Sequence, residues 1–163
     1  MKLEASSIEI GRLPTLDARS LRVAVVCARC NDSIVSKLLE GARAAWARHG
    51  GPSEGLILQR VPGAFELPLA CQHIAWTGRV HAVVALGCVI RGDTPHFDYV
   101  AGECARGLMH AGLLTGLPII FGVLTVENPA QAEERADPAR MNKGGEALEA
   151  ALEMIQLLRE NRS

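Results

Sequence analysis

A polar loop with the residue types of a phosphate site follows one of the apolar runs of the chain. Its letters are RGDTPH, residues 91–96. Gly92 permits a tight turn, and the backbone N–H groups around Asp93 and Thr94 are placed to point at an anion. His96 follows, and an imidazole carries protons readily near neutral pH. The loop therefore suggests phosphate binding beside a proton carrier, although a solvated loop whose histidine caps a helix fits the same spacing.

A carboxylate stands at the start of an apolar helix in RVPGAFELPLA, residues 60–70. A turn at Pro62-Gly63 places Glu66 in the first helical turn. There its carboxylate could accept hydrogen bonds from the hydroxyl groups of a polar ligand. Complementing the helix dipole is the alternative role.

Arg135 and Lys143 lie in the cationic segment QAEERADPARMNKGG, residues 131–145. The guanidinium fork of Arg135 suits a phosphate, and Lys143 could balance a second anion. Charge at the end of a helix, followed by a solvated loop, explains the same residues, and nothing local excludes it.

Cys27 and Cys30 form a Cys-x-x-Cys motif, which raises the question of a redox dithiol or half of a zinc site. No second such motif or Cys/His pair completes four ligands, so we expect no metal. Cys27 falls within an expected strand, whereas the first thiol of a thioredoxin-like pair is activated at a helix start. We interpret the spacing as coincidence, with Cys30 at the mouth of the site.

These segments each adjoin an element that the apolar pattern predicts. Buried strands are expected at 21–28, 55–61, 81–90 and 117–126, and helices from Asn31 or Asp32 to 49, then at 65–77, 97–114, 130–135 and 144–159. Such alternation implies right-handed crossovers and a parallel sheet covered on both faces. We predict a three-layer α/β/α sandwich with four parallel strands, whose ligands bind beyond the carboxyl ends of the strands.

The totals of the chain limit its organisation and partners. With 163 residues, 48% of them hydrophobic, we expect one domain over 21–163 and an arm over 1–20 that could add an edge strand to a neighbouring subunit. A net charge of -1 provides no field for nucleic acid or an anionic membrane. We see no apolar signal segment or membrane span, and the five cysteines are scattered, so we expect a cytoplasmic protein without disulfides.

Five segments, in this order and at this spacing, closely resemble the lumazine synthase family. They are PGAFELPLA, ALGCVIRGDTPHFDYVAGE, PIIFGVLTVEN, QAEERA and NKGGEAL. The resemblance covers about residues 21 to 158 and implies a flavodoxin-like fold. It implies a transferase that condenses 5-amino-6-ribitylaminouracil with 3,4-dihydroxy-2-butanone 4-phosphate. The products would be 6,7-dimethyl-8-ribityllumazine, phosphate and water, in the penultimate step of riboflavin biosynthesis, without a cofactor or metal.

The resemblance also implies a role for each candidate residue. His96 would shuttle protons, and Arg135 would hold the butanone phosphate together with the backbone of Gly92, Asp93 and Thr94. The pyrimidine and its ribityl chain would lie against Cys30, Asn31, Ala64, Phe65, Glu66, Val89 and Ile90. Phe121 and Lys143 would reach in from the adjacent subunit. Orientation should supply most of the rate, because the amine substrate is already nucleophilic.

One position departs from the family pattern. Family members typically carry an aromatic residue between the arginine and the asparagine of Arg29-Cys30-Asn31, and its ring stacks on the pyrimidine. A thiol offers far less contact area than a ring. We therefore expect weaker pyrimidine affinity with the chemistry retained.

The resemblance implies a pentamer and favours a closed shell of twelve pentamers. Members that stop at pentamers often carry an insertion between the last two helices, and the linker ADPARM, 136–141, shows none. Pro138 argues mildly against the shell, because it fixes the backbone where the last helix sets its angle. An association with riboflavin synthase is a further expectation.

Three other functions stay open on the sequence. Archaeal riboflavin synthase resembles this fold, but the complete GDTPH and QAEERA motifs favour the lumazine-forming reaction. A protein that holds a flavin or its precursor without turnover is a second alternative, which His96 and Arg135 argue against, because storage does not require phosphate release. The third, a dithiol redox protein, would require a disulfide between Cys27 and Cys30.

Overall fold

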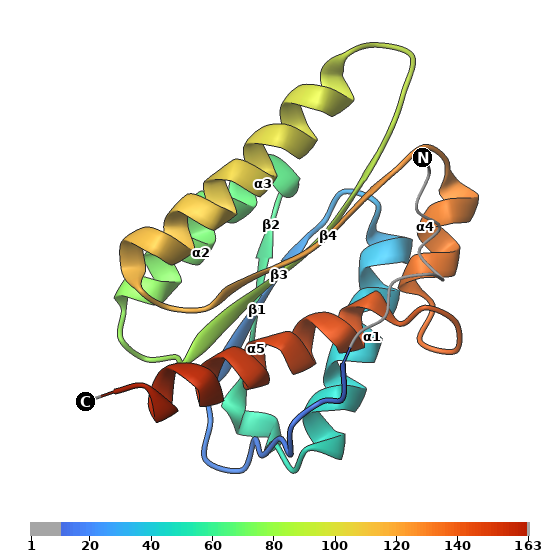
Figure 1. Ribbon diagram of the computed structural model, residues 1–163. Coiled ribbons are helices and arrows are strands. Elements are labelled where there is room, and N and C mark those ends of the chain that lie inside the picture. The colour runs from blue at the N-terminus through green and yellow to red at the C-terminus, as the bar shows by residue number, and fades with distance from the viewer. Residues whose placement is uncertain (1–10, 163) are drawn as a thin grey trace.

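The strands pair in the order β2-β1-β3-β4, and every pair is parallel. The computed structural model describes residues 11–162 (Figure 1). Its elements are β1 (Val23–Ala28), α1 (Asp32–Arg48), η2 (Ser53–Gly55), β2 (Leu56–Val61), η3 (Ala64–Glu66), α2 (Leu67–Trp76), β3 (Ala82–Ile90), α3 (His96–Thr115), β4 (Ile119–Val126), α4 (Pro129–Ala136) and α5 (Lys143–Glu160). Helices α2 and α3 cover one face of the sheet, and α1 and α5 cover the other, so the predicted three-layer sandwich is confirmed.

Burial on both faces explains the apolar strands at the centre of the sheet. All six residues of β1 are buried, as are the first seven of β3. A strand covered on both sides has no polar face, so its sequence is a continuous apolar run rather than an alternation. The edge strands β2 and β4 are only partly covered, and their sequences include exposed positions such as Gln59 and Phe121.

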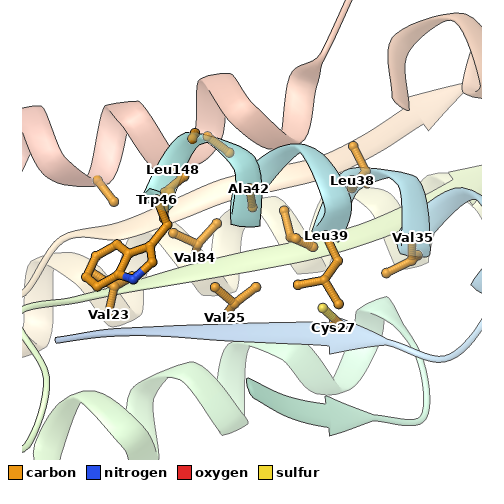
Figure 2. Packing of buried hydrophobic residues seen from close by; sticks show 14 of the residues in the cluster. Val23, Val25, Cys27, Val35, Leu38, Leu39, Ala42, Trp46, Val84 and Leu148 are labelled. Atoms are coloured by element: carbon orange, nitrogen blue, oxygen red, sulfur yellow. The ribbon is translucent and has the colours of Figure 1, made fainter. Parts of the chain in front are cut away.

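Helix α1 packs an apolar stripe on the two central strands. In Figure 2, Trp46 lies over Val23, and the side chains of Leu39 and Cys27 face one another. The indole Nε1 of Trp46 also donates to the carbonyl of Pro52, 2.8 Å away. The ring is therefore both packed and hydrogen-bonded, and it anchors the carboxyl end of α1.

Helices α1 and α5 approach closely because glycines stand at the contact. A methyl group on Gly144 would overlap the backbone carbonyl of Leu38, and one on Gly41 would meet the side chain of Asn142. Asn142 adopts a left-handed φ of 49° and caps α5 by accepting from the N–H of Gly145 at 3.3 Å. This packing fixes the start of α5 and with it Lys143.

The helix expected over 65–77 begins two residues late. Residues Ala64–Glu66 form a 3-10 turn, and α2 starts at Leu67 with Pro68 in its first turn. Proline is tolerated there because the first N–H groups of a helix have no internal acceptor. Glu66 consequently sits at the N-cap of α2 rather than inside the helix.

Part of the predicted amino-terminal arm lies outside the described residues. The weak strand pattern SIEIGRL spans 7–13, and only its last three positions are described, none of them in a strand. Farther along, Leu16 and Ala18 are buried in the core, and the N–H of Ala18 donates to His49 O at 2.9 Å. A domain boundary at residue 20 stays a prediction. Among residues 11–162, no helix is both long and apolar enough to cross a membrane.

Candidate active site

Backbone hydrogen bonds join the loops that leave the carboxyl ends of the strands. Beyond β1, the N–H of Arg29 donates to Val61 O at 2.9 Å and that of Cys30 to Pro62 O at 3.2 Å. Beyond β3, the N–H of Arg91 donates to Val126 O at 2.9 Å. The loops therefore meet at one edge of the sheet, where ligands bind in parallel α/β folds.

The loop after β1 presents a thiol and an amide. Cys30 is exposed, and Asn31 adopts a left-handed φ of 59° at the N-cap of α1. Asn31 was expected as one of two candidate caps, but its side chain does not cap the helix. Its Nδ2 donates instead to Cys88 O at 2.9 Å, across to β3. This bond fixes the β1 exit against the neighbouring strand.

The loop after β2 provides an aromatic wall and a carboxylate. Ala64 is buried, whereas Phe65 is 60% exposed and Glu66 is exposed beside it. At the end of the central strand β3, Val89 and Ile90 are half-buried. An exposed phenylalanine ring at the carboxyl ends of the strands offers apolar surface to a flat ligand.

The loop after β3 keeps its backbone donors free. Within the described residues, the N–H groups of Gly92, Asp93 and Thr94 have no hydrogen-bond acceptor. His96 is the first residue of α3, one position earlier than expected, and its side chain is exposed without a hydrogen-bond partner in residues 11–162. Unpaired N–H groups at a helix start form an anion-binding geometry. A histidine at the same place can exchange protons with the bound group.

Arg135 lies on α4, the short helix that follows β4 (Figure 1). Asn128 caps this helix by accepting from the N–H of Gln131 at 2.9 Å. Arg135 donates from Nη1 to Gln131 O at 3.3 Å, and Glu134 lies 3.8 Å from the same nitrogen. An ion pair between Lys37 and Glu133 holds α4 against α1. The Arg135 side chain is about 30% exposed, and its guanidinium has donors left for a further anion.

A single chain does not bring Phe121 and Lys143 to these loops. Phe121 lies five residues before the end of β4, which is about 16 Å along a strand. It lines a hollow of about 290 Å³ together with Lys143, and no residue of the loops after β1, β2 or β3 takes part. Both side chains are accessible there, Phe121 at 46% exposure and Lys143 in an ion pair of 2.8 Å with Glu146. They could therefore serve a site on another subunit.

The two cysteines of the Cys-x-x-Cys motif lie in different surroundings, Cys27 within β1 and Cys30 exposed in the turn that follows it. Cys27 is buried in the core beside α1 (Figure 2), and burial raises the pKa of its thiol to about 11. A protonated, buried thiol is a poor nucleophile. No three His, Cys, Asp or Glu side chains gather as a metal site in residues 11–162.

The fold and its loops define a class of protein. A parallel α/β sandwich with free backbone donors, a histidine and an arginine beyond its strands is typical of enzymes that act on phosphorylated substrates. Comparison with known proteins narrows that class. The family model described as 6,7-dimethyl-8-ribityllumazine synthase matches residues 20–159.

Curated relatives carry the same description. The protein of that name from Thermus thermophilus is 51% identical over 145 residues, which is 89% of this chain and 92% of the relative. The one from Halorhodospira halophila is 54% identical over 139 residues, 85% of this chain and 89% of the relative. The one from Chlorobium chlorochromatii is 49% identical over 146 residues, with coverages of 90% and 94%. The chain belongs to the 6,7-dimethyl-8-ribityllumazine synthase family.

Proposed function

We propose that this protein condenses 5-amino-6-ribitylaminouracil with 3,4-dihydroxy-2-butanone 4-phosphate to give 6,7-dimethyl-8-ribityllumazine, phosphate and water. The observation that carries the proposal is the set of N–H groups at 92–94 that find no acceptor among residues 11–162, in the loop that ends at His96, in a chain of this family. A reaction that expels phosphate requires an anion site beside a proton carrier. A protein that only stores a flavin does not require either.

Each side chain has a place in this proposal. The loop 92–94 and Arg135 hold the phosphate, and His96 moves protons as the Schiff base forms, phosphate leaves and the ring closes. Glu66 accepts hydrogen bonds from the hydroxyl groups of the ribityl chain. The pyrimidine rests against the exposed ring of Phe65 and the half-buried Val89 and Ile90, with Cys30, Asn31 and Ala64 completing the pocket.

The active site in this proposal is completed at a subunit interface, because Phe121 and Lys143 serve the neighbouring subunit. Their shared hollow, apart from the three loops of their own chain, supports this arrangement. We propose a pentamer that closes into a shell of twelve pentamers, since the linker between α4 and α5 carries no insertion. A cytoplasmic location, the boundary of the arm and an association with riboflavin synthase stay predictions from the sequence.

Native mass spectrometry tests the assembly. We expect one particle of sixty chains at micromolar subunit concentration. A population of pentamers or decamers only, stable on raising the concentration, would contradict the shell while leaving the interface-built site in place. Monomers with full activity would refute both.

Replacing the proposed proton carrier tests the chemistry. His96→Ala is expected to lower kcat about 10- to 100-fold with little change in either KM, because proton transfer is lost and positioning is kept. His110→Ala is the matched control, since it removes an exposed histidine about 20 Å farther along the same helix. Steady-state kinetics that show equal kcat for both variants would remove His96 from the mechanism.

Restoring an aromatic ring at position 30 tests the pyrimidine pocket. Cys30→Phe is expected to lower the KM for the pyrimidine roughly two- to tenfold, because stacking contributes about 0.5–1.5 kcal/mol beyond burial. The KM for the butanone phosphate should stay within twofold of wild type. Cys30→Ser is the control, since it removes the thiol without adding a ring. An unchanged pyrimidine KM in Cys30→Phe would show that this position does not face the ring.

A further inference from the structure

Arg91 connects three segments around the phosphate loop. It is the first residue after β3, and its side chain is about 39% exposed. Its Nε donates to Glu127 Oε2 at 2.8 Å, and its Nη1 donates to Asp98 Oδ1 at 3.3 Å. The guanidinium carbon also lies 4.3 Å from the ring centroid of Phe97. One planar group thus makes two charge-assisted hydrogen bonds and a cation–π contact.

These contacts hold the two ends of the loop 92–96 together. The backbone N–H of Arg91 donates to the carbonyl of Val126, the last residue of β4, at 2.9 Å. The side chain of the same residue reaches Asp98, in the first turn of α3. One set of contacts, those of Arg91 with Glu127 and Asp98, therefore holds both the exit of β3 and the start of α3, and we call it the Arg91 clamp. The clamp restricts the directions of the free N–H groups of the loop and of His96.

The second carboxylate extends the clamp toward Arg135. The backbone N–H of Glu127 donates to Gln131 Oε1 at 2.8 Å, and the carbonyl of Gln131 accepts from Arg135 Nη1 at 3.3 Å. The chain of contacts from Arg91 through Glu127 and Gln131 to Arg135 runs along the cap of α4. It couples the phosphate loop to the helix that carries the arginine.

The charges around Arg91 also favour a role in ordering the phosphate loop. Arg91 faces two carboxylates, Glu127 and Asp98, so its single positive charge is fully engaged and offsets one of the two negative charges. Without the guanidinium, both carboxylates would stand unpaired beside the site of a phosphate dianion. Unpaired carboxylates beside an anion site weaken anion binding by like-charge repulsion.

We infer that Arg91 is a positioning residue that orders the phosphate loop and aligns it with Arg135. The inference rests on the proposed function, because it assigns the loop and Arg135 to the substrate phosphate. Arg91 does not contact the reacting atoms in this account. It acts through Glu127 and Asp98, and its effect should fall on the phosphorylated substrate alone.

Arg91→Ala in the assembled protein should raise the KM for the butanone phosphate about tenfold and leave the KM for the pyrimidine within twofold. Arg91→Lys should recover part of the loss, because lysine keeps the charge but not the fork or the stacking. The control is Arg19→Ala, which removes another arginine that hydrogen-bonds a carboxylate, that of Asp17, in the segment before β1. It should leave both KM values unchanged.

A double variant of Arg91 and Glu127 distinguishes a role of Arg91 in aligning the phosphate loop from a role in the stability of the fold. If the two side chains act as a unit, the double variant Arg91→Ala, Glu127→Gln should bind the phosphorylated substrate no more weakly than Arg91→Ala alone. Additive losses would overturn the inference. So would equal increases in both KM values with a lower melting temperature, because a merely structural role would produce them.

Calorimetric titration with inorganic phosphate distinguishes the failure of this inference from that of the proposed function. A wild-type protein that binds phosphate without turnover would refute the synthase activity, and weaker binding in Arg91→Ala would still support the clamp. Equal phosphate affinity in wild type and Arg91→Ala would refute the clamp, whatever the turnover.

Discussion

Arg135→Ala is expected to lower kcat/KM about 100- to 1000-fold. In the proposed site its guanidinium neutralises the substrate phosphate, and removing one partner of a hydrogen-bonded charge pair costs about 2–5 kcal/mol when the other charge is left unpaired. The loss should appear in kcat as well as in KM, because the same group stabilises the phosphate as it leaves. Steady-state kinetics with each substrate varied in turn measure both parameters.

Arg140→Ala is the matched control for this prediction. Arg140 lies 3.6 Å from Glu134, the same carboxylate that neighbours Arg135, but it stands on the exposed linker after α4. Removing it changes the net charge equally and should alter kcat/KM by less than twofold. Comparable losses in both variants would mean that a diffuse positive field, rather than a specific contact, attracts the substrate.

Gly144→Ala is expected to destabilise the fold by about 3 kcal/mol or more, or roughly 10 °C in melting temperature. The added methyl group would lie 2.7 Å from the Cα of Leu38 and would overlap its carbonyl, so α1 and α5 must separate. Backbone atoms cannot move aside as the tip of a side chain does. Thermal unfolding followed by circular dichroism measures the change.

Gly102→Ala provides the comparison within another helix. A methyl group at Gly102 on α3 meets no atom within 4 Å, and alanine is the better helix former by about 1 kcal/mol. This variant should be as stable as wild type or more stable. A Gly144→Ala protein with the same melting temperature as Gly102→Ala would show that the contact between α1 and α5 is looser than described.

The strands and helices were predictable because burial alone dictates their patterns. Strand β3 must be apolar on both faces, so HAVVALGCVI is recognisable without any knowledge of its neighbours. Helix α5 repeats its apolar residues with a helical period because one side packs on the sheet. The phosphate loop was recognisable for a related reason, since glycine, free N–H groups and a histidine follow a strand that ends at the ligand edge.

Pairwise contacts could not be predicted from the same letters. Asn31 is a plausible helix cap in sequence, yet its amide bonds Cys88 O, fifty-seven residues away. Arg91 gives no sign in sequence that it spans from Glu127 to Asp98. Both partners are fixed by strand register and loop path, which depend on the whole sheet. The expectation that Phe121 and Lys143 serve another subunit rested on family resemblance alone, because neither position follows a strand end.

Measuring lumazine and inorganic phosphate in the same sample tests the proposed condensation. Purified protein is mixed with 5-amino-6-ribitylaminouracil and 3,4-dihydroxy-2-butanone 4-phosphate, and both products are measured against the spontaneous reaction. We expect the two products to form in equal amounts, at a rate well above the uncatalysed one, and more slowly with His96→Ala and Arg135→Ala. Rates equal to the uncatalysed reaction, with substrate still bound, would contradict the proposed condensation and identify a protein that retains the pocket without the reaction.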